Sequence, residues 1–302
     1  MKTLTIITTT YNRAYCIHQV YESLKRQDSN DFCWLVVDDG STDNTREVIE
    51  DFMNEGLVDI EYIYQENKGM TGARNTAYNA CKTELNTIID SDDWLADGAV
   101  RTIIDFWNAN KREDLAGIMA LDIKPNGEVI GTTLPSFLKE TTVMEAFGKH
   151  KVRGDKKLIY RTDISRLYPY PEYPGENFFP ASYKFLLIDK LYKMLVLNVG
   201  ICVVDYNDNS MSFDKIAQYR RCPKGFIQYY NTAMECYEYP KMIIKNCLMY
   251  IAISKLNKEK KSFRNRLEKH LPYCFIFLDL FSHFTLPTQK EELFLFLKNI
   301  EK

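Results

Sequence analysis

The sequence predicts an α/β fold, in which a mostly parallel central sheet is flanked by helices and followed by a helical C-terminal extension. In the first 120 residues, short apolar runs typical of strands alternate with segments whose apolar residues recur at helical spacing. The dipeptide Asn126-Gly127, a strong hairpin signal, interrupts this alternation. From about residue 212 the pattern is helical, without repeats or a low-complexity linker.

The alternation is regular enough to assign its elements. Strands are expected at 4–10, 33–39, 59–64, 85–90 and 116–121. Helices are expected between and after them, around Val20, around Ile49, over 71–82 and around Ile103. Asn44 and Glu47 are placed as a capping pair for the second helix. Strands that alternate with helices imply a mostly parallel sheet covered on both faces.

The second part of the chain is expected to complete the same domain. Beyond the hairpin, the pattern predicts strands at 154–161 and 193–206 with a helix over 175–190 between them. We therefore expect one domain over 1–211, made of halves 1–120 and 121–211, and a helical extension over 212–302.

Composition narrows the class of protein. A chain of 302 residues with 45% hydrophobic residues can bury a sizeable core, and its net charge of −2 gives no argument for a nucleic-acid partner. The eight cysteines are scattered and form no CxxC pair, which favours reduced thiols over a disulfide or zinc framework. We expect a cytoplasmic protein, because no apolar run reaches about 18 residues and the start does not resemble a signal peptide.

Polar clusters follow each of the first four predicted strands. They are Thr8 to Arg13, Asp38 to Asp43, Glu66 to Gly69 with Arg74, and Asp90 to Asp93. In parallel sheets, ligands bind beyond the carboxyl ends of the strands. Four polar strand ends on one edge therefore predict a binding site.

The fourth cluster has the spacing of a cation site. Residues i and i+2 of an extended chain point the same way, so Asp90 and Asp92 can approach one centre. Carboxylate oxygens suit a hard divalent cation such as Mg²⁺ or Mn²⁺, which often shares its ligands with phosphates. The alternative is a solvated loop in which Asp92 or Asp93 caps the next helix.

The segments "TIITTTYNR", "LVVDDGSTDNT", "QENKGMTGARNTAYNAC" and "TIIDSDDWL" resemble the successive motifs of the family-two glycosyltransferases, which have the GT-A fold. They cover roughly the first 110 residues, in the order of the family. The resemblance implies inverting transfer of a sugar from a nucleoside diphosphate sugar, usually UDP-linked, to a saccharide or lipid-linked acceptor in surface polysaccharide synthesis. It implies that Mn²⁺ or Mg²⁺ holds the diphosphate, and that 1–120 binds the donor and 121–211 the acceptor.

The resemblance also assigns roles to single residues. Thr9 and Tyr11 match the segment that lines the nucleobase, and Asp39 matches the acid that reads the edge of the uracil ring. Asp90-Ser91-Asp92 matches the DxD motif, with Asp92 nearest the metal and Asp90 a second metal ligand nearest the ribose or sugar. The other residues assigned to the donor are Asn12, Arg13, Lys68 and Arg74.

Plainer roles remain open for several of these residues. The threonines of 8–10 are also ordinary strand residues, and Asp38 is expected only to start a turn. Asp43 or Asn44 is expected to cap the following helix. Arg74 alternatively pairs with a surface acid.

An inverting enzyme needs a carboxylate that takes the proton of the acceptor hydroxyl. The family supplies it from an acidic pair at the start of a helix, and the matching stretch here is "YPGENFF". Glu176 is assigned as the base, while Asn177 stands where the family has Asp and cannot accept the proton. Glu172 and Asp155 are the alternatives, and Glu176 could instead compensate the dipole of a helix's first turn.

Two other functions compete with the transferase. A sugar-phosphate nucleotidyltransferase would carry a Gly-rich basic loop after the first strand, where this chain has Tyr11-Asn12-Arg13. A non-catalytic nucleotide-sugar-binding module is supported only by Asn177. Residues 255–302 combine a basic stretch with an apolar one, which predicts either peripheral contact with the inner face of a membrane or helices that complete the core.

Overall fold

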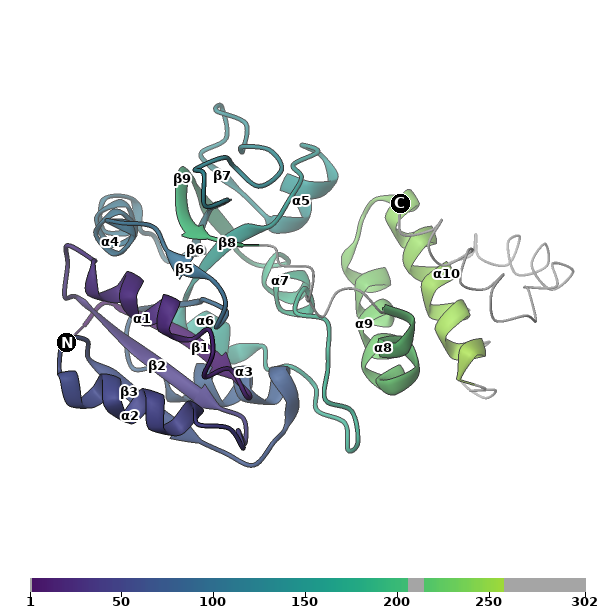
Figure 1. The fold of residues 1–302 in the computed structure, drawn as a ribbon. Helices are drawn as coiled ribbons and strands as arrows, with labels where there is room; N and C mark the ends of the chain where they lie inside the picture. The colour runs from purple at the N-terminus through teal and green to yellow at the C-terminus, as the bar shows by residue number, and fades with distance from the viewer. Residues whose placement is uncertain (1, 206–214, 258–302) are drawn as a thin grey trace, which may run out of the picture. The chain divides into compact units, whose positions relative to one another are not determined.

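The computed structural model describes residues 2–205 and 215–257 (Figure 1). The chain divides into two compact units. The first unit is Met1–Tyr170 with Leu187–Asp208, and the second unit is Pro171–Leu186 with Asn209–Lys302.

The first unit contains the sheet, whose strand order is β3-β2-β1-β4-β8-β6-β9-β5, with β7 paired to β9. The four strands β3 (Ile60–Tyr64), β2 (Phe32–Asp38), β1 (Leu4–Thr10) and β4 (Leu85–Ile88) are parallel. Their carboxyl ends therefore lie at one edge, as the sequence predicted.

The other strands make the remainder of the sheet mixed. β8 (Lys156–Arg161) runs antiparallel to both β4 and β6 (Leu115–Ile123), and β6 is parallel to β9 (Lys193–Val203). Two short strands, β5 (Trp94–Leu95) and β7 (Glu140–Thr141), run antiparallel to β9. Because β8 is antiparallel to β4, the start of β8 meets the end of β4.

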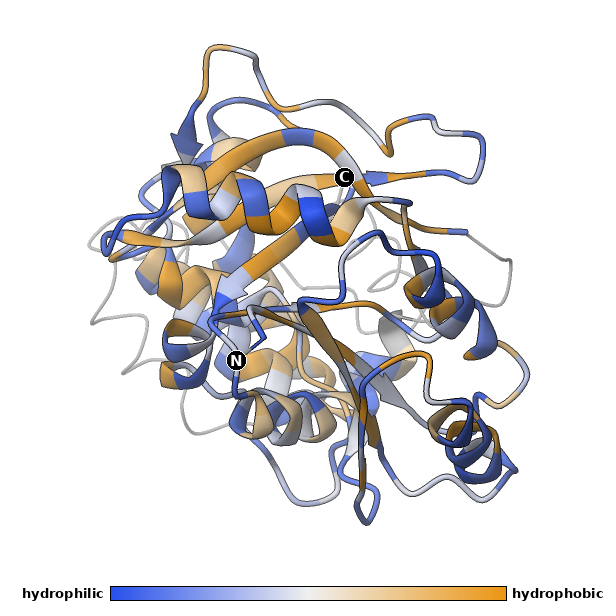
Figure 2. Cartoon of the chain, turned by 90° about the vertical axis from the view of Figure 1, so that its left-hand side faces the viewer, coloured by the Kyte–Doolittle hydropathy of each residue, from blue (hydrophilic) through white to orange (hydrophobic). Residues whose placement is uncertain are grey.

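Helices cover both faces of this sheet. Buried residues of α1 (His18–Lys25), α2 (Thr45–Glu55) and α4 (Ala99–Asn110) form one core with alternate strand residues such as Ile6 and Trp34. The intervening strand residues point to the other face, where α3 (Gly69–Ala80) packs against β1 and β2. Figure 2 shows strands that are mostly hydrophobic and helices that carry both hydrophobic and hydrophilic residues.

Two short helices, α5 (Val143–Gly148) and α6 (Thr162–Leu167), also belong to this unit, whereas α7 (Tyr183–Ile188) begins in the segment assigned to the second unit. The predicted hairpin is present, because Lys124 and Glu128 are joined by a backbone hydrogen bond of 2.8 Å and Gly127 adopts φ 84°. A positive φ at this turn explains why glycine stands there.

Two local predictions were wrong. The Asn44–Glu47 capping pair is absent, since Asn44 makes no side-chain hydrogen bond at the start of α2. The alternative cap is confirmed, because Oδ1 of Asp43 accepts from the Thr45 amide at 3.0 Å. The helix predicted over 175–190 is formed only at Tyr183–Ile188. Pro180 explains this later start, since proline disfavours helix in the residue before it.

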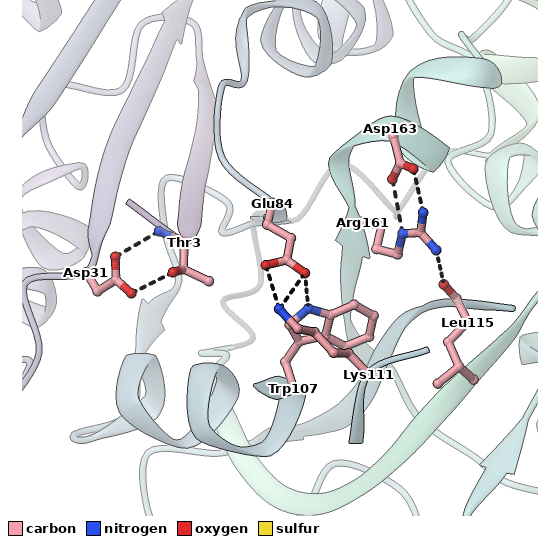
Figure 3. A network of polar contacts seen from close by, with 8 residues as sticks. All are labelled: Thr3, Asp31, Glu84, Trp107, Lys111, Leu115, Arg161 and Asp163. Carbon is pink, nitrogen blue, oxygen red and sulfur yellow. Dashed lines mark hydrogen bonds and ion pairs between the residues drawn. The ribbon is translucent and has the colours of Figure 1, made fainter. Parts of the chain in front are cut away.

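The edge of the sheet opposite to the polar strand ends is held by paired charges (Figure 3). The Glu84 carboxylate accepts from Nε1 of Trp107 at 2.7 Å and from Nζ of Lys111 at 3.1 Å. Arg161 donates to the Leu115 carbonyl and forms an ion pair with Asp163. Each charged group drawn at this edge has a partner, with Asp31 accepting from Thr3, and none of the predicted site residues lies among them.

The second unit is helical, with α8 (Lys215–Arg221), α9 (Pro223–Cys236) and α10 (Pro240–Leu256) in its described part. It also includes residues 171–186, which the sequence had placed with the sheet. Phe178 explains this grouping, because its ring stacks on Phe226 of α9 with centroids 5.6 Å apart.

The described helices contain no segment that is both long and apolar enough to cross a membrane. The predicted membrane-contacting segment 255–302 lies outside the described residues except for its first three positions. The seven cysteines within the described ranges are free, in agreement with the expectation of reduced thiols.

Candidate functional site

The polar loops after β1, β2 and β4 come together at one edge of the first unit. The backbone amide of Asp39 donates to the Thr10 carbonyl at 2.9 Å, which joins the ends of β1 and β2. Nη1 of Arg13 lies 3.7 Å from Oδ2 of Asp92, which joins the ends of β1 and β4. The structure thus brings together residues predicted from three separate strand ends.

Asn12 holds the β1 loop to the β2 loop. Its backbone has φ 55°, a left-handed conformation that Asn tolerates better than most residues. The side-chain Oδ1 of Asn12 accepts from the backbone amides of Thr42 at 2.7 Å and Asp43 at 3.3 Å. The backbone amide of Asn12 donates to Ser41 Oγ at 2.8 Å. The Asn12 side chain is therefore committed to the frame of the site.

The residues on either side of Asn12 along β1 and its loop differ in accessibility. Thr8 is buried and its hydroxyl accepts from Nε1 of Trp34 at 3.0 Å, so it supports the sheet. Thr9 is partly exposed. The Tyr11 side chain is 49% exposed, which leaves its ring available for stacking on a flat ligand.

Asp39 is buried and is oriented by the loop that follows β3. Its Oδ1 accepts from Nε2 of Gln65 at 2.6 Å and from the Lys68 amide at 2.9 Å. Burial raises the pKa of Asp39, and these hydrogen bonds oppose that effect. The Lys68 backbone therefore positions Asp39, while the Lys68 side chain is exposed.

Asp38 has the turn role expected for it. Its Oδ1 accepts from the Ser41 amide at 2.8 Å, and its Oδ2 accepts from the Tyr62 hydroxyl at 2.8 Å. Both oxygens are thus used inside the protein, and the side chain is fully buried.

Arg74 and Asp90 form an ion pair. The Arg74 side chain on α3 is 9% exposed, and its Nη2 donates to Oδ1 of Asp90 at 3.1 Å. Burial would raise the pKa of Asp90, but the charges of Arg74 and Lys157 outweigh it and hold this pKa below its ordinary value. Asp90 is therefore ionised at neutral pH, with half of its side chain exposed.

Asp92 has a looser environment. Its 3.7 Å distance to Arg13 is too long for a hydrogen bond, and its side chain is 46% exposed. Arg13 donates instead to the Tyr15 hydroxyl at 2.6 Å. Ser91 between the two acids is 5% exposed, so its side chain is mostly covered by the protein.

The donor set fits a hard divalent cation, provided that a ligand supplies the remaining oxygens. Asp92 and the ionised Asp90 offer carboxylate oxygens at one edge. Within the described ranges, no group of three or more His, Cys, Asp or Glu side chains is arranged to hold a metal ion. Mg²⁺ is commonly held by one or two carboxylates together with phosphate oxygens and water, which matches such a site.

A buried cationic residue behind the acidic stretch was missed from the sequence. Lys157 on β8 has a 12% exposed side chain, and its Nζ lies 3.7 Å from Oδ1 of Asp122 and donates to the Ile88 carbonyl at 3.3 Å. Asp93 is also buried, and desolvation raises its pKa to about 7 although Lys157 lowers it. The available signal was only a pair of lysines at the start of a predicted strand.

Glu176 belongs to the second unit, where it caps a helix. Its Oε1 accepts from the Lys224 amide and its Oε2 from the Gly225 amide, both at 2.9 Å, in the first turn of α9. The negative charge at this end is favourable for the helix dipole. The sequence had offered dipole compensation as the alternative role of Glu176, although in a helix that would contain it.

The two alternative bases, Glu172 and Asp155, are both exposed. Asp155 belongs to the first unit and directly precedes β8. Because β8 pairs antiparallel with β4, Asp155 lies at the same edge of the sheet as Asp90.

Known proteins resemble this chain in both sequence and fold. The model of the family described as "Glycosyl transferase family 2" matches residues 5–166, more than half of the chain. The GalNAc(5)-diNAcBac-PP-undecaprenol beta-1,3-glucosyltransferase of Campylobacter jejuni is 30% identical over 106 residues, which cover 34% of this chain and 34% of that enzyme. Across the curated relatives, the matched segment covers between 14% and 35% of their length.

Two solved structures share the fold. TarS 1-349 of S. aureus in complex with UDP-GlcNAc has a TM-score of 0.60 and 20% identity, covering 84% of this chain and 72% of that one. The mannosyltransferase PcManGT of Pyrobaculum calidifontis, in complex with GDP-Man and Mn²⁺, has a TM-score of 0.55 and 16% identity, covering 99% and 84%. At these identities the likeness shows the fold alone, and it confirms the GT-A fold predicted from the sequence.

The unequal surroundings of the two acids predict unequal effects on stability. Asp90→Ala leaves the buried Arg74 guanidinium without its carboxylate, so we expect the free energy of unfolding to fall by about 1–3 kcal/mol. Asp92→Ala removes a solvated carboxylate, so a change within about 0.5 kcal/mol is expected. Urea denaturation of both variants measures this difference, and an Asp92→Ala variant as unstable as Asp90→Ala would contradict it.

Proposed function

This chain belongs to glycosyl transferase family 2, and we propose that it transfers a sugar from a nucleoside diphosphate sugar, with UDP as the nucleotide, to a hydroxyl of a saccharide or lipid-linked acceptor. One observation carries the proposal. The ionised Asp90 and the exposed Asp92 lie at the same strand edge as the buried Asp39, with Arg13 and Arg74 beside the acids.

The nucleotide would be recognised at the ends of β1 and β2. The exposed ring of Tyr11 can stack on a base, and the Asp39 carboxylate can accept a hydrogen bond from the N–H of a pyrimidine ring. Because Gln65 and Lys68 fix the Asp39 carboxylate, it is oriented before a ligand arrives. Thr9 is proposed to line the same place.

The diphosphate would lie toward the end of β4. Asp92 and Asp90 are the residues that would hold Mn²⁺ or Mg²⁺, and the bound ion would offset the charge that develops on the leaving diphosphate. Arg13 is partly exposed and Lys68 is exposed, so both can reach an anionic ligand. Arg74 keeps Asp90 ionised and in place.

The proton acceptor is proposed to be Glu176. Each of its carboxylate oxygens accepts one amide hydrogen bond, and a carboxylate oxygen has a second lone pair for the acceptor hydroxyl. Asp155 and Glu172 are the alternatives. Asp155 has in its favour a place on the same sheet edge as the DxD-like stretch.

The acceptor is proposed to be lipid-linked, and the enzyme to act in the cytoplasm at the inner face of a membrane. The name of the Campylobacter jejuni relative includes an undecaprenol-linked saccharide, which supports a lipid-linked acceptor. Such an acceptor would suit a cytoplasmic enzyme that contacts the inner face of a membrane through 255–302. That contact stays a prediction, because the segment lies almost entirely outside the described residues.

Metal-dependent turnover tests the function itself. We expect the purified full chain to release UDP from at least one member of a UDP-sugar panel when Mn²⁺ is present. Asp92→Ala should reduce this release by at least about 100-fold, because a catalytic metal supplies several kcal/mol of stabilisation.

Asp97→Ala is the matched control, since Asp97 forms an exposed ion pair with Arg26 and lies outside the site. It should retain wild-type turnover. Tight binding of UDP-sugars without any turnover would instead identify a non-catalytic nucleotide-sugar-binding module. Mn²⁺-stimulated turnover in Asp92→Ala would refute the metal assignment.

Base recognition by Asp39 predicts a change in nucleotide specificity. Uracil presents an N–H where cytosine presents a bare ring nitrogen, so the wild type should bind UDP more tightly than CDP. Asp39→Ala should weaken UDP binding by about 1–3 kcal/mol and bring the two affinities together. Calorimetry with both nucleotides checks this, and a preserved preference for UDP in the variant would show that another group reads the base.

Proton acceptance by Glu176 predicts a loss of turnover without a loss of donor affinity. Glu176→Gln keeps the shape but cannot take a proton, so turnover should fall by at least about 100-fold. It also places an amide nitrogen against an amide of α9, so the melting temperature must be measured alongside. If turnover survives at temperatures where the variant is folded, Asp155→Asn and Glu172→Gln will locate the base.

A further inference from the structure

The side chain of Lys157 is mostly buried and contacts the backbone that leads into the acidic stretch. Its Nζ donates to the carbonyl of Ile88, the last residue of β4, at 3.3 Å. The segment Asp90 to Asp93 begins two residues later. A hydrogen bond to this carbonyl therefore ties β8 to the point where β4 turns into the site.

The charges around Lys157 come from several elements. Asp122 on β6 lies 3.7 Å away and is 3% exposed, and its Oδ1 has no hydrogen-bond partner in the part of the chain that the structure describes. The carboxylates of Asp90 and Asp93 also act on Lys157, as does the Cys202 thiol of β9. The single ammonium of Lys157 thus interacts electrostatically with three carboxylates, of which Asp93 and Asp122 are buried.

Removal of this ammonium would leave like charges close together in a poorly solvated place. Buried carboxylates repel each other and tend to take up protons or move apart when no cation is near. Arg74 on α3 forms an ion pair with Asp90 and so balances one of these carboxylates. Lys157 is therefore placed to offset the charge of Asp93 and Asp122 at the end of β4.

We propose that Lys157 is a positioning residue, whose ammonium holds the Ile88 carbonyl and the acidic stretch that follows it in one conformation, so that Asp90 and Asp92 are presented in a fixed arrangement before ligands bind. Lys157 does not touch the substrate in this proposal. The part that concerns ligands rests on the proposed function, whereas the part that concerns the loop does not.

Lys156 supplies a matched control. It is the preceding residue of the same strand, is 9% exposed, and carries the same charge. Its Nζ instead lies within hydrogen-bond distance of four carbonyl oxygens and shares its three N–H groups among them: those of Ile130, Arg153, Gly154 and Asp155. Lys156→Met therefore removes an equally buried ammonium without touching Ile88.

Hydrogen–deuterium exchange tests the proposal without substrate. Two amides report on the stretch, Ile89, which donates to the Ile7 carbonyl at 2.8 Å, and Asp93, which donates to the Asp90 carbonyl at 3.0 Å. We expect Lys157→Met to accelerate exchange in peptides covering 88–95 by at least tenfold, with little change in peptides covering 32–38. Lys156→Met should leave 88–95 unchanged.

A second set of variants separates positioning from a simple buried ion pair with Asp122. The double variant Lys157→Met/Asp122→Asn removes both charges and should recover melting temperature, because replacing a whole buried pair is often tolerated. We expect it to keep the fast exchange at 88–95 and a kcat at least tenfold below wild type, with a smaller change in donor KM. Lys157→Arg keeps the positive charge, so it should show the slow exchange at 88–95 and the kcat of the wild type.

The outcomes are distinguishable. Equal exchange at 88–95 in Lys157→Met and Lys156→Met would overturn the proposal, as would a double variant that regains both slow exchange and kcat. If Lys157→Met does not fold, the double variant provides the same comparison. A wild-type chain with no turnover but the expected exchange pattern would refute the proposed function and leave the role of Lys157 in the loop supported.

Discussion

The end of β4 concentrates negative charge, and the site depends on how that charge is balanced. Asp90, Asp92 and Asp93 follow directly on a buried strand. The positive groups come from three separate elements, with Arg74 on α3, Arg13 after β1 and Lys157 on β8. None is a neighbour of the acidic stretch in sequence, so the charge balance exists only once the sheet has formed.

The same fold uses several polar residues to build the frame and leaves others for ligands. Asn12 and Asp38 have their side-chain oxygens occupied by backbone amides and a tyrosine hydroxyl, and they fix the loops after β1 and β2. Tyr11 and Asp92 are each about half exposed at the same edge. The polar residues at these strand ends are therefore of two kinds. Some hold the loops in place, and others are accessible to a ligand.

The sequence could predict which polar residues gather at this edge, but not which of them support the loops and which remain free for ligands. The apolar runs predicted the parallel strands, and parallel strands necessarily bring their carboxyl ends to one edge. The role of Lys157 was not predictable, because it depends on the antiparallel register of β8 against β4, which no local pattern specifies. Glu176 likewise caps a helix 48 residues away from it, and that partner is fixed only by tertiary packing. Locally, the Asn44 cap was wrong because the adjacent Asp43 reaches the same helix start.

The charge of the site also bears on how its two proposed ligands, the divalent cation and the nucleoside diphosphate sugar, would bind. Around the end of β4 alone, four carboxylates lie near three cations: Asp90, Asp92, Asp93 and Asp122 near Arg13, Arg74 and Lys157. Burial raises the pKa of Asp93 to about 7, so this acid is partly protonated at neutral pH and the sum is close to zero. A nearly neutral site attracts neither a lone dication nor a lone diphosphate strongly. A dication together with a nucleoside diphosphate sugar, which carries one negative charge per phosphate, is itself nearly neutral and places opposite charges beside Asp92 and Arg13. Electrostatics at this edge therefore favour the joint binding of metal and donor over the binding of either alone.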